Sequence, residues 1–394
     1  MTKTAAGAII RNKKINDAKL IQKQESITDT GIASCSSLLY GDRDGVLFEH
    51  HYGASDPERG TPVDPGTVFH MYSMTKVMTV TAALMLYDRG LLDLDDEVSR
   101  YLPAYAALTV SERGRIRKAE NKMTVRHLFT MTSGLTYLAE DPHGRAADLE
   151  RGLGSGGWDT VRFAEELASV PLAFEPGERF LYGLSHDVLG ALIEIISGKT
   201  LAEYMKEYIF APLCMNDTYF YQDLPEKYIP RLAKNTEWNG EKYVNIPLLS
   251  RPAPALGVSG GGKLYSGGSG IVCTARDYAK FLSAMLGGRL LDRRTAAMMT
   301  APQLSVKQRK SFNDPAFDPS TFGDEYTFGL GVRVQDRPAR GGSAGEWGWS
   351  GALGTWFFVD AADGLWFLYL HQHTPAGHGR YIIPLRNVFY GEVD

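Results

Sequence analysis

The sequence predicts an α/β domain into which a mostly helical domain is inserted. Strand-like runs lie near both ends of the chain, and helical patterns fill its middle. We expect the strands of the two ends to share one sheet, with residues 1–75 and 250–394 in the α/β domain and residues 76–249 in the helical domain. A length of 394 residues agrees with two to three domains.

The N-terminal part predicts a hairpin followed by a helix. The runs 34–40 and 46–52 are strand-like, and residues 41–45 between them have the composition of a hairpin turn. From Val77 to Tyr87 apolar residues recur at spacings of three and four, and Gly90 stands where a helix would end. This is the strongest helical pattern in the chain.

Shorter helices are expected further along the chain. Thr124 is placed to cap a helix through Leu128, and Ser185 to cap one that runs to Ile196 and ends before Gly198. Another helix is expected around residues 278–285.

The C-terminal third predicts strands again, at residues 328–334, 355–359 and 365–370. The last of these is a continuous apolar run, which is typical of a strand buried on both faces. A final helix is expected over residues 382–390.

Composition excludes several classes of function. The net charge of −4 argues against a nucleic-acid-binding protein, and 44% hydrophobic residues argue against disorder. No segment approaches the ~20 apolar residues of a membrane helix, and the N-terminal residues lack a secretory pattern. The three cysteines, Cys35, Cys214 and Cys273, form neither a disulfide framework nor a metal motif, which favours a reducing compartment. We therefore expect a cytoplasmic protein with no membrane or nucleic-acid partner.

The most informative motif is Ser73-Met-Thr-Lys76 at the start of the strongest helix. Residues at i and i+3 share a helix face, so Lys76 can reach the Ser73 hydroxyl. A serine is a weak nucleophile until a base takes its proton, and burial tunes a lysine towards that task. An N-capping serine followed by an exposed lysine is the alternative. However, no other serine has a lysine three residues later.

Two further elements fit the same chemistry. Tyr182 precedes the expected Ser185 helix and can serve as a second proton-transfer group, although it also fits a structural role beside a Pro-Gly turn. The segment 348–355, Gly-Trp-Ser-Gly-Ala-Leu-Gly-Thr, places small residues at the start of an expected strand, where a substrate can lie close to the backbone. A backbone N–H there can pair with that of Ser73 as an oxyanion hole.

Together these elements resemble the serine β-lactamase / penicillin-recognising superfamily, and most closely the family VIII carboxylesterases. The resemblance covers about residues 38–389. Further matching stretches are 69–76, 124–135, 187–190, 210–213 and 260–270. It implies a β-lactamase-like fold, in which helices flank an antiparallel sheet.

By position, the resemblance makes Ser73 the nucleophile, Lys76 its base partner and Tyr182 the proton shuttle. Trp349-Ser350-Gly351 replaces the family's Lys-Thr-Gly strand motif, and Ala352 would supply the second oxyanion N–H.

Two departures from the family pattern bear on the substrate. Leu184 stands where β-lactamases and peptidoglycan peptidases carry the Asn of Tyr-x-Asn, and Trp349 stands where they carry a cationic lysine. The resemblance therefore implies an esterase for uncharged, short-chain, small-molecule esters that needs no cofactor. A β-lactamase, a D-amino-acid peptidase and an acyltransferase using the same residues stay open as alternatives. So does a binding protein without activity. The choice between Lys76 and Tyr182 as the base, and the oligomeric state, also stay open.

Other motifs are better explained by structural roles than by catalysis or ligand binding. The segments 257–261 and 341–345 fit G-x-S-x-G but lack the strand and helix that a nucleophile elbow requires. Residues 197–200 resemble the end of a P-loop and are expected to be a helix C-terminus. His371 and His373 have ligand-like spacing but no evident third ligand, so we expect no metal. A basic cluster at residues 113–118 is expected to be a solvated surface.

Overall fold

The computed structural model describes residues 15, 17–137, 149, 157–248, 263–314, 323–339 and 341–391. Its helices are α1 (Asp17–Asp29), α2 (Thr75–Asp88), α3 (Val125–Phe129), α5 (Thr160–Leu167), α6 (Ser185–Ser197), α7 (Leu201–Met205), α8 (Ala275–Leu286), α9 (Arg293–Met299), α10 (Val306–Phe312) and α11 (His378–Gly391). Its strands are β1 (Cys35–Asp42), β2 (Gly45–Asp56), β3 (Thr61–Pro62), β4 (Val68–His70), β5 (Thr109–Glu112), β6 (Arg115–Lys118), β7 (Thr218–Phe220), β8 (Thr236–Trp238), β9 (Tyr243–Asn245), β10 (Ile271–Thr274), β11 (Tyr326–Phe328), β12 (Arg333–Gln335), β13 (Trp347–Ser350), β14 (Trp356–Asp360) and β15 (Leu365–Leu370).

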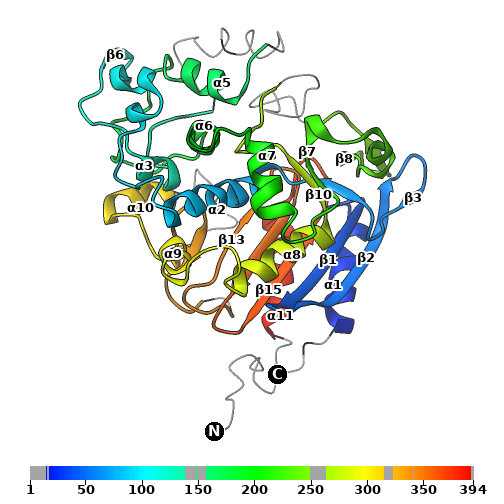
Figure 1. Ribbon diagram of the computed structural model, residues 1–394. Coiled ribbons are helices and arrows are strands. Elements are labelled where there is room, and N and C mark those ends of the chain that lie inside the picture. The colour runs from blue at the N-terminus through cyan, green and yellow to red at the C-terminus, as the bar shows by residue number, and fades with distance from the viewer. Residues whose placement is uncertain are drawn as a thin grey trace.

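Strands from the two ends of the chain form one antiparallel sheet. Within the described residues its order is β11-β12-β13-β14-β15-β1-β2-β3. The N- and C-terminal strands join where β1 pairs with β15, with Leu39 opposite Leu368. Figure 1 shows the blue N-terminal strands beside the orange C-terminal ones. The predicted antiparallel sheet, formed by both chain ends in a mixed α/β architecture, is therefore confirmed.

Both faces of this sheet are covered. All six residues of β15 are buried, as the apolar run predicted. Because successive side chains point to opposite faces, Phe367 and Tyr369 join the core under α11, whereas Trp366 and Leu368 join the core that contains α2 and α8. Helices α1 and α11 cover one face and α8 covers the other (Figure 1).

A smaller sheet links the large sheet to the helices of the middle of the chain. Its order is β4-β10-β7, and β4 leads through a 3₁₀ turn, Tyr72–Met74, directly into α2. Helix α6 packs against α2, α3 and α5. Among the described helices, none combines the length and apolar character needed to cross a membrane.

Several expected elements are placed differently. The strand expected at residues 328–334 is instead two strands, β11 and β12, because the chain reverses at Gly329–Val332, where Gly331 has a φ of +74°. The small residues of 348–355 do not start a strand: they end β13 and form the turn into β14. A hairpin of β5 and β6 occupies residues 109–118, where only helices and loops were expected.

Ser185 is not the N-cap of α6. The cap position belongs to Leu184, and Ser185 is the first helical residue, with its hydroxyl 2.8 Å from that of Ser133. The end of the helix is as expected, because Gly198 adopts a left-handed conformation with a φ of +70°. Thr124 caps α3 as expected.

Candidate active site

Ser73 lies in the 3₁₀ turn that opens α2. The residue before it, Tyr72, has a φ of +45°, a conformation that costs a non-glycine residue about 1–2 kcal/mol. Neighbouring backbone holds the turn in place: Met71 donates to the carbonyl of Ile271 at 2.9 Å, and the Ile271 N–H donates to Thr75 Oγ1 at 3.1 Å. The nucleophile candidate therefore stands on a rigid support.

Lys76 points at Ser73 from the first turn of α2. Its side chain is 2% exposed, and its Nζ donates to Ser73 Oγ at 3.3 Å. The same ammonium donates to the Gly268 carbonyl at 2.8 Å and to the Tyr137 hydroxyl at 3.4 Å. These three contacts match the three donors of a lysine. Sequence reasoning predicted the first contact and missed the other two.

Tyr182 lies beside this pair on the loop before α6. The Lys76 Nζ is 4.8 Å from the centre of its ring, within the range of a cation–π interaction. Its hydroxyl accepts a hydrogen bond of 3.0 Å from Nε1–H of Trp349. Tyr182 and Trp349, which are far from Ser73 and Lys76 in sequence, therefore lie beside them.

A second tyrosine completes the cluster. Tyr137 meets Tyr182 edge to face, with ring centres 5.9 Å apart. Burial of the Tyr137 hydroxyl raises its pKa well above the usual value, the negative charges that Tyr182 and Asp187 can carry raise it further, and its hydrogen bond with Ser73 lowers it. Sequence reasoning missed Tyr137 as a site residue. The one indication of its role was that it lies two residues after the 124–135 stretch, which matches the family.

The end of β13 closes the site from the other side. A Cβ at Gly351 would stand 2.4 Å from the Met71 carbonyl oxygen, so only glycine allows this approach to the Ser73 turn. The following turn is held by a bond from Gly351 N–H to the Thr355 carbonyl at 2.7 Å. Ala352 is exposed, and its N–H has no protein acceptor among the described residues. Ser350 is half-buried.

The family model described as Beta-lactamase matches residues 25–387. The chain belongs to the Beta-lactamase family. Esterase EstB of Burkholderia gladioli is 31% identical over 361 residues, which cover 88% of each chain.

Solved structures of similar fold agree with this family assignment. One is EstCE1, described as a hydrolase with promiscuous acyltransferase activity, with a TM-score of 0.79 and 25% identity over 95% of this chain and 98% of that one. Another is unliganded simvastatin synthase LovD of Aspergillus terreus, with a TM-score of 0.80 and 25% identity over 96% of this chain and 97% of that one. The protein is thus related to serine hydrolases and acyltransferases of the β-lactamase fold.

The two residues that depart from the β-lactamase pattern, Leu184 and Trp349, are both buried. Leu184 is 0% exposed and Trp349 is 4% exposed. The leucine cannot hydrogen-bond to Lys76, and the indole carries no charge. The partners of Lys76 are instead a backbone carbonyl and a phenol, as described above.

Two titratable side chains near Lys76, His186 and Asp187, come from α6. Burial, and then the charge of Lys76, lower the pKa of His186 to about 3, so this imidazole is neutral at physiological pH. Asp187 is 2% exposed and accepts hydrogen bonds from Ser266 and Gly268. The sequence showed Asp187 only as an acidic residue in a first helical turn and as part of the matching 187–190 stretch.

Other candidates from the sequence lie elsewhere. Ser343 lies in a turn before β13, with no helix after it, and residues 257–261 lie outside the described residues. His371 bonds through Nε2 to the Ala376 carbonyl, and His373 through Nδ1 to Thr236. Within the described part of the chain, no group of three or more His, Cys, Asp or Glu side chains is arranged for a metal. Residues 197–200 run from the last residue of α6 to Thr200, the N-cap of α7.

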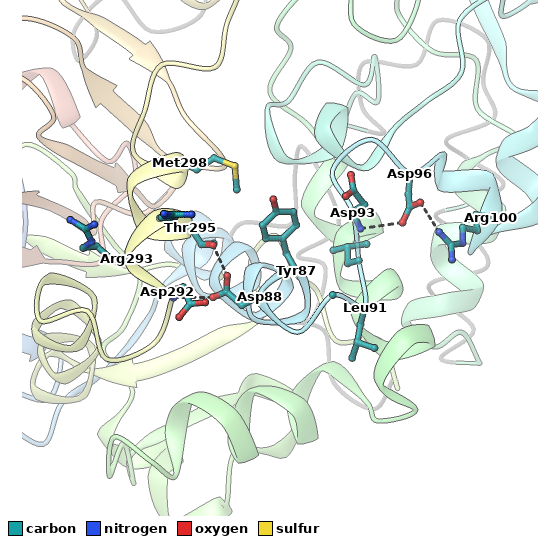
Figure 2. Close-up of a pocket in the computed structure, with 13 residues that line it drawn as sticks. Tyr87, Asp88, Leu91, Asp93, Asp96, Arg100, Asp292, Arg293, Thr295 and Met298 are labelled. Atoms are coloured by element: carbon teal, nitrogen blue, oxygen red, sulfur yellow. Dashed lines mark hydrogen bonds and ion pairs between the residues drawn. The ribbon is translucent and has the colours of Figure 1, made fainter.

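A surface pocket of about 790 Å³ lies at the far end of α2, beside Asp88 (Figure 2). At 1.5 Å per residue, Asp88 stands ~18 Å along the helix from Lys76. Its carboxylate bonds to the N–H of Asp292 and the hydroxyl of Thr295, and Asp96 pairs with Arg100. These acids therefore already have structural partners, and the pocket is separate from the Ser73 cluster.

Proposed function

We propose that this protein is a serine hydrolase that cleaves uncharged, short-chain carboxylic esters through an acyl-enzyme on Ser73, and that it is a family VIII carboxylesterase. The observation that carries the proposal is the 3.3 Å contact between Lys76 Nζ and Ser73 Oγ inside a cluster of two tyrosines. A nucleophile within hydrogen-bond reach of a base, with the base held by further groups, is the arrangement that covalent catalysis requires. The esterase EstB among its relatives supports the same assignment.

In acylation, the Ser73 proton passes to the Lys76–Tyr182 pair while Oγ forms a bond to the carbonyl carbon of the ester. The bond between that carbon and the alcohol oxygen then breaks, and the pair returns the proton to the leaving alcohol. Water repeats these steps on the acyl-enzyme and regenerates Ser73. Lys76 and Tyr182 are alternatives as the first proton acceptor, since Lys76 contacts Ser73 and the Tyr182 ring lies beside Lys76.

The backbone N–H groups of Ser73 and Ala352 are proposed as the oxyanion hole. The exposed position of Ala352 and the close approach of Gly351 to Met71 support this assignment. Such donors stabilise the charge that develops on the carbonyl oxygen and are worth about 10²–10³ in rate.

The choice of an uncharged small-molecule ester rests on Trp349 and Leu184. Neither side chain offers a positive charge to the carboxylate of a β-lactam or a peptide C-terminus. Trp349 also donates its one N–H to Tyr182, so it presents mainly apolar surface. A β-lactamase and a D-amino-acid peptidase are therefore the weaker alternatives. We propose the cytoplasm as the compartment, because the three cysteines are free.

Acyl transfer to an alcohol or amine is a second candidate. EstCE1 is described as a hydrolase with promiscuous acyltransferase activity and LovD as a simvastatin synthase, and both superpose on nearly the whole chain. The same acyl-enzyme serves both outcomes. Measuring the ratio of ester product to free acid with 1-butanol present separates them.

A fluorophosphonate probe followed by mass spectrometry tests the proposal. We expect one adduct, on the peptide that contains Ser73, together with loss of p-nitrophenyl butyrate hydrolysis. Ser73→Ala is expected to take up no probe, and Ser343→Ala to be labelled like the wild type. An adduct on a different serine, or an active protein with no adduct, would contradict the proposal.

A further inference from the structure

Asp187 is a buried carboxyl group that the proposed mechanism does not use. It stands in the first turn of α6 and is 2% exposed. Its Oδ1 accepts hydrogen bonds from Ser266 Oγ at 2.6 Å and from Gly268 N–H at 3.1 Å. A carboxylate removed from water is expensive unless it is paired or fully hydrogen-bonded, so its presence here calls for a reason.

Gly268 lies between this carboxylate and Lys76. Its N–H donates to Asp187, and its carbonyl accepts from Lys76 Nζ at 2.8 Å. A Cβ at Gly268 would stand 2.6 Å from Asp187 Oδ2, so no side chain fits between the two. Thr79, on the turn of α2 after Lys76, also binds this loop, through the Gly267 carbonyl at 2.8 Å. Helices α2 and α6 therefore both hold the loop.

Asp187 and Lys76 interact electrostatically. The pKa of Asp187 lies above its usual value because the carboxyl group is buried, and the Lys76 ammonium and the bonds from Ser266 and Gly268 oppose this shift. The other titratable groups facing Lys76 in the described structure are Tyr137, Tyr182 and His186. Two are phenols and the third is a neutral imidazole, so Asp187 is the carboxyl group among them.

We propose that Asp187 is a positioning residue for Lys76, supplying the counter-charge of the buried ammonium and holding the Gly268 carbonyl that keeps it beside Ser73. The inference rests on the proposed function. It also explains how the site works with Leu184, which offers Lys76 no polar partner.

The test separates the effect of the Asp187 charge from that of the hydrogen bonds that hold the Gly268 loop. Asp187→Asn keeps an oxygen that accepts from Ser266 and Gly268 but removes the charge. Ser266→Ala and Thr79→Val are the matched controls, because each removes one bond to the same loop and leaves the charge. Each protein is assayed with p-nitrophenyl butyrate from pH 5 to 9, after its fold is checked by circular dichroism and Tm.

We expect Asp187→Asn to lose at least tenfold in kcat, with KM within threefold of the wild type. The acid limb of its kcat/KM profile is expected to move to lower pH, because the variant has no carboxylate facing the proton-transfer groups. Ser266→Ala and Thr79→Val are expected to lose less than about fivefold and to keep the limb in place.

An unmoved limb in Asp187→Asn, at any level of kcat, would overturn this inference alone. If Asp187→Asn does not fold, Asp187→Glu and Asp187→Gln make the same comparison, and the glutamate is expected to keep the wild-type limb. Absence of probe labelling at Ser73 in the wild type would overturn the proposed function, and this inference with it.

Discussion

The indole Nε1–H of Trp349 donates a hydrogen bond of 3.0 Å to the hydroxyl oxygen of Tyr182. The two rings are 5.3 Å apart between centres, and the residues come from β13 and from the loop before α6. A donor aimed at a phenol oxygen stabilises that oxygen when the phenol gives up its proton. The residue that replaces the family's cationic lysine is therefore tied to the proposed proton shuttle.

Trp349→Phe is expected to lower kcat for p-nitrophenyl butyrate by about three- to tenfold and to leave KM nearly unchanged. Phenylalanine keeps an aromatic wall for the substrate but has no N–H for Tyr182, and a hydrogen bond of this kind contributes about 0.5–1.5 kcal/mol. Trp349→Phe combined with Tyr182→Phe is expected to be no slower than Tyr182→Phe alone. An additional loss in that double variant would show that the indole acts through another group.

Ser73→Ala is expected to abolish hydrolysis of p-nitrophenyl butyrate, whereas Ser343→Ala keeps most of it. Ser73 contacts Lys76 and Tyr137, but Ser343 lies in a turn whose N–H binds Asp360. The same comparison applies to Ser259, which lies in the other G-x-S-x-G segment. An active Ser73→Ala together with an inactive variant at either other serine would reverse the assignment.

Lys76→Ala and Tyr182→Phe are each expected to lower kcat by about 10²–10⁴, the usual worth of a positioned proton-transfer group. The two losses should overlap strongly, because both residues serve one proton path. A double variant that loses the product of the two single losses would mean that they act independently. Circular dichroism of each variant is the control, since Lys76 is also buried in the core.

How much of this site the sequence predicted depends on how its residues are brought together. Ser73 and Lys76 are three residues apart, in the 3₁₀ turn that opens α2 and in the first turn of α2, so local helical geometry places them in contact. Tyr182 and the 348–355 segment were singled out from their residue types and expected positions, and the resemblance to a family then assigned the roles of Tyr182 and Trp349. Asp187 and the Gly268 carbonyl were missed as partners of Lys76, because their contact depends on how a loop 81 residues after Asp187 folds back on α6. No local pattern carries that information.

The fold likewise contains elements that local sequence patterns predicted and elements that depend on tertiary packing. The β1–β2 hairpin and the buried β15 were predicted from turn composition and from a continuous apolar run. The β11–β12 hairpin was predicted as one strand, because its reversal depends on Gly331, which packs against Val80 and admits no Cβ there. A glycine inside an apolar run does not by itself distinguish a bulge from a reversal.

Acidification is expected to destabilise the protein through buried histidines such as His70. Burial lowers the pKa of His70 from its usual 6.5 to about 4 in the folded protein. Between these values the unfolded chain binds a proton that the folded chain does not, so stability falls as pH drops from 6.5 and levels off below about 4. The full loss from one such residue is about 3 kcal/mol. In urea unfolding from pH 4.5 to 7.5, His70→Phe is expected to show a shallower slope, and an unchanged slope would contradict the assignment.

Trp349→Lys is expected to move substrate preference from uncharged esters towards β-lactams. The wild-type indole forms an apolar wall, so p-nitrophenyl butyrate is expected to be hydrolysed much faster than benzylpenicillin, although a β-lactam can still acylate Ser73. A lysine at this position supplies a cation for the β-lactam carboxylate, and a charge-assisted hydrogen bond is worth about 1.5–3 kcal/mol.

The ratio of β-lactam to ester kcat/KM is therefore expected to rise by about ten- to a hundredfold at most. Part of that rise will come from slower ester turnover, because the substitution also removes the bond to Tyr182. Trp349→Phe is the matched control for this loss, and the gain attributable to the charge is the rise in Trp349→Lys beyond that in Trp349→Phe. Leu184, which is buried two residues after Tyr182, limits the gain in β-lactam turnover further because it offers no amide to the site. A wild-type protein that hydrolyses benzylpenicillin or a cephalosporin better than p-nitrophenyl butyrate would refute the role given to Trp349.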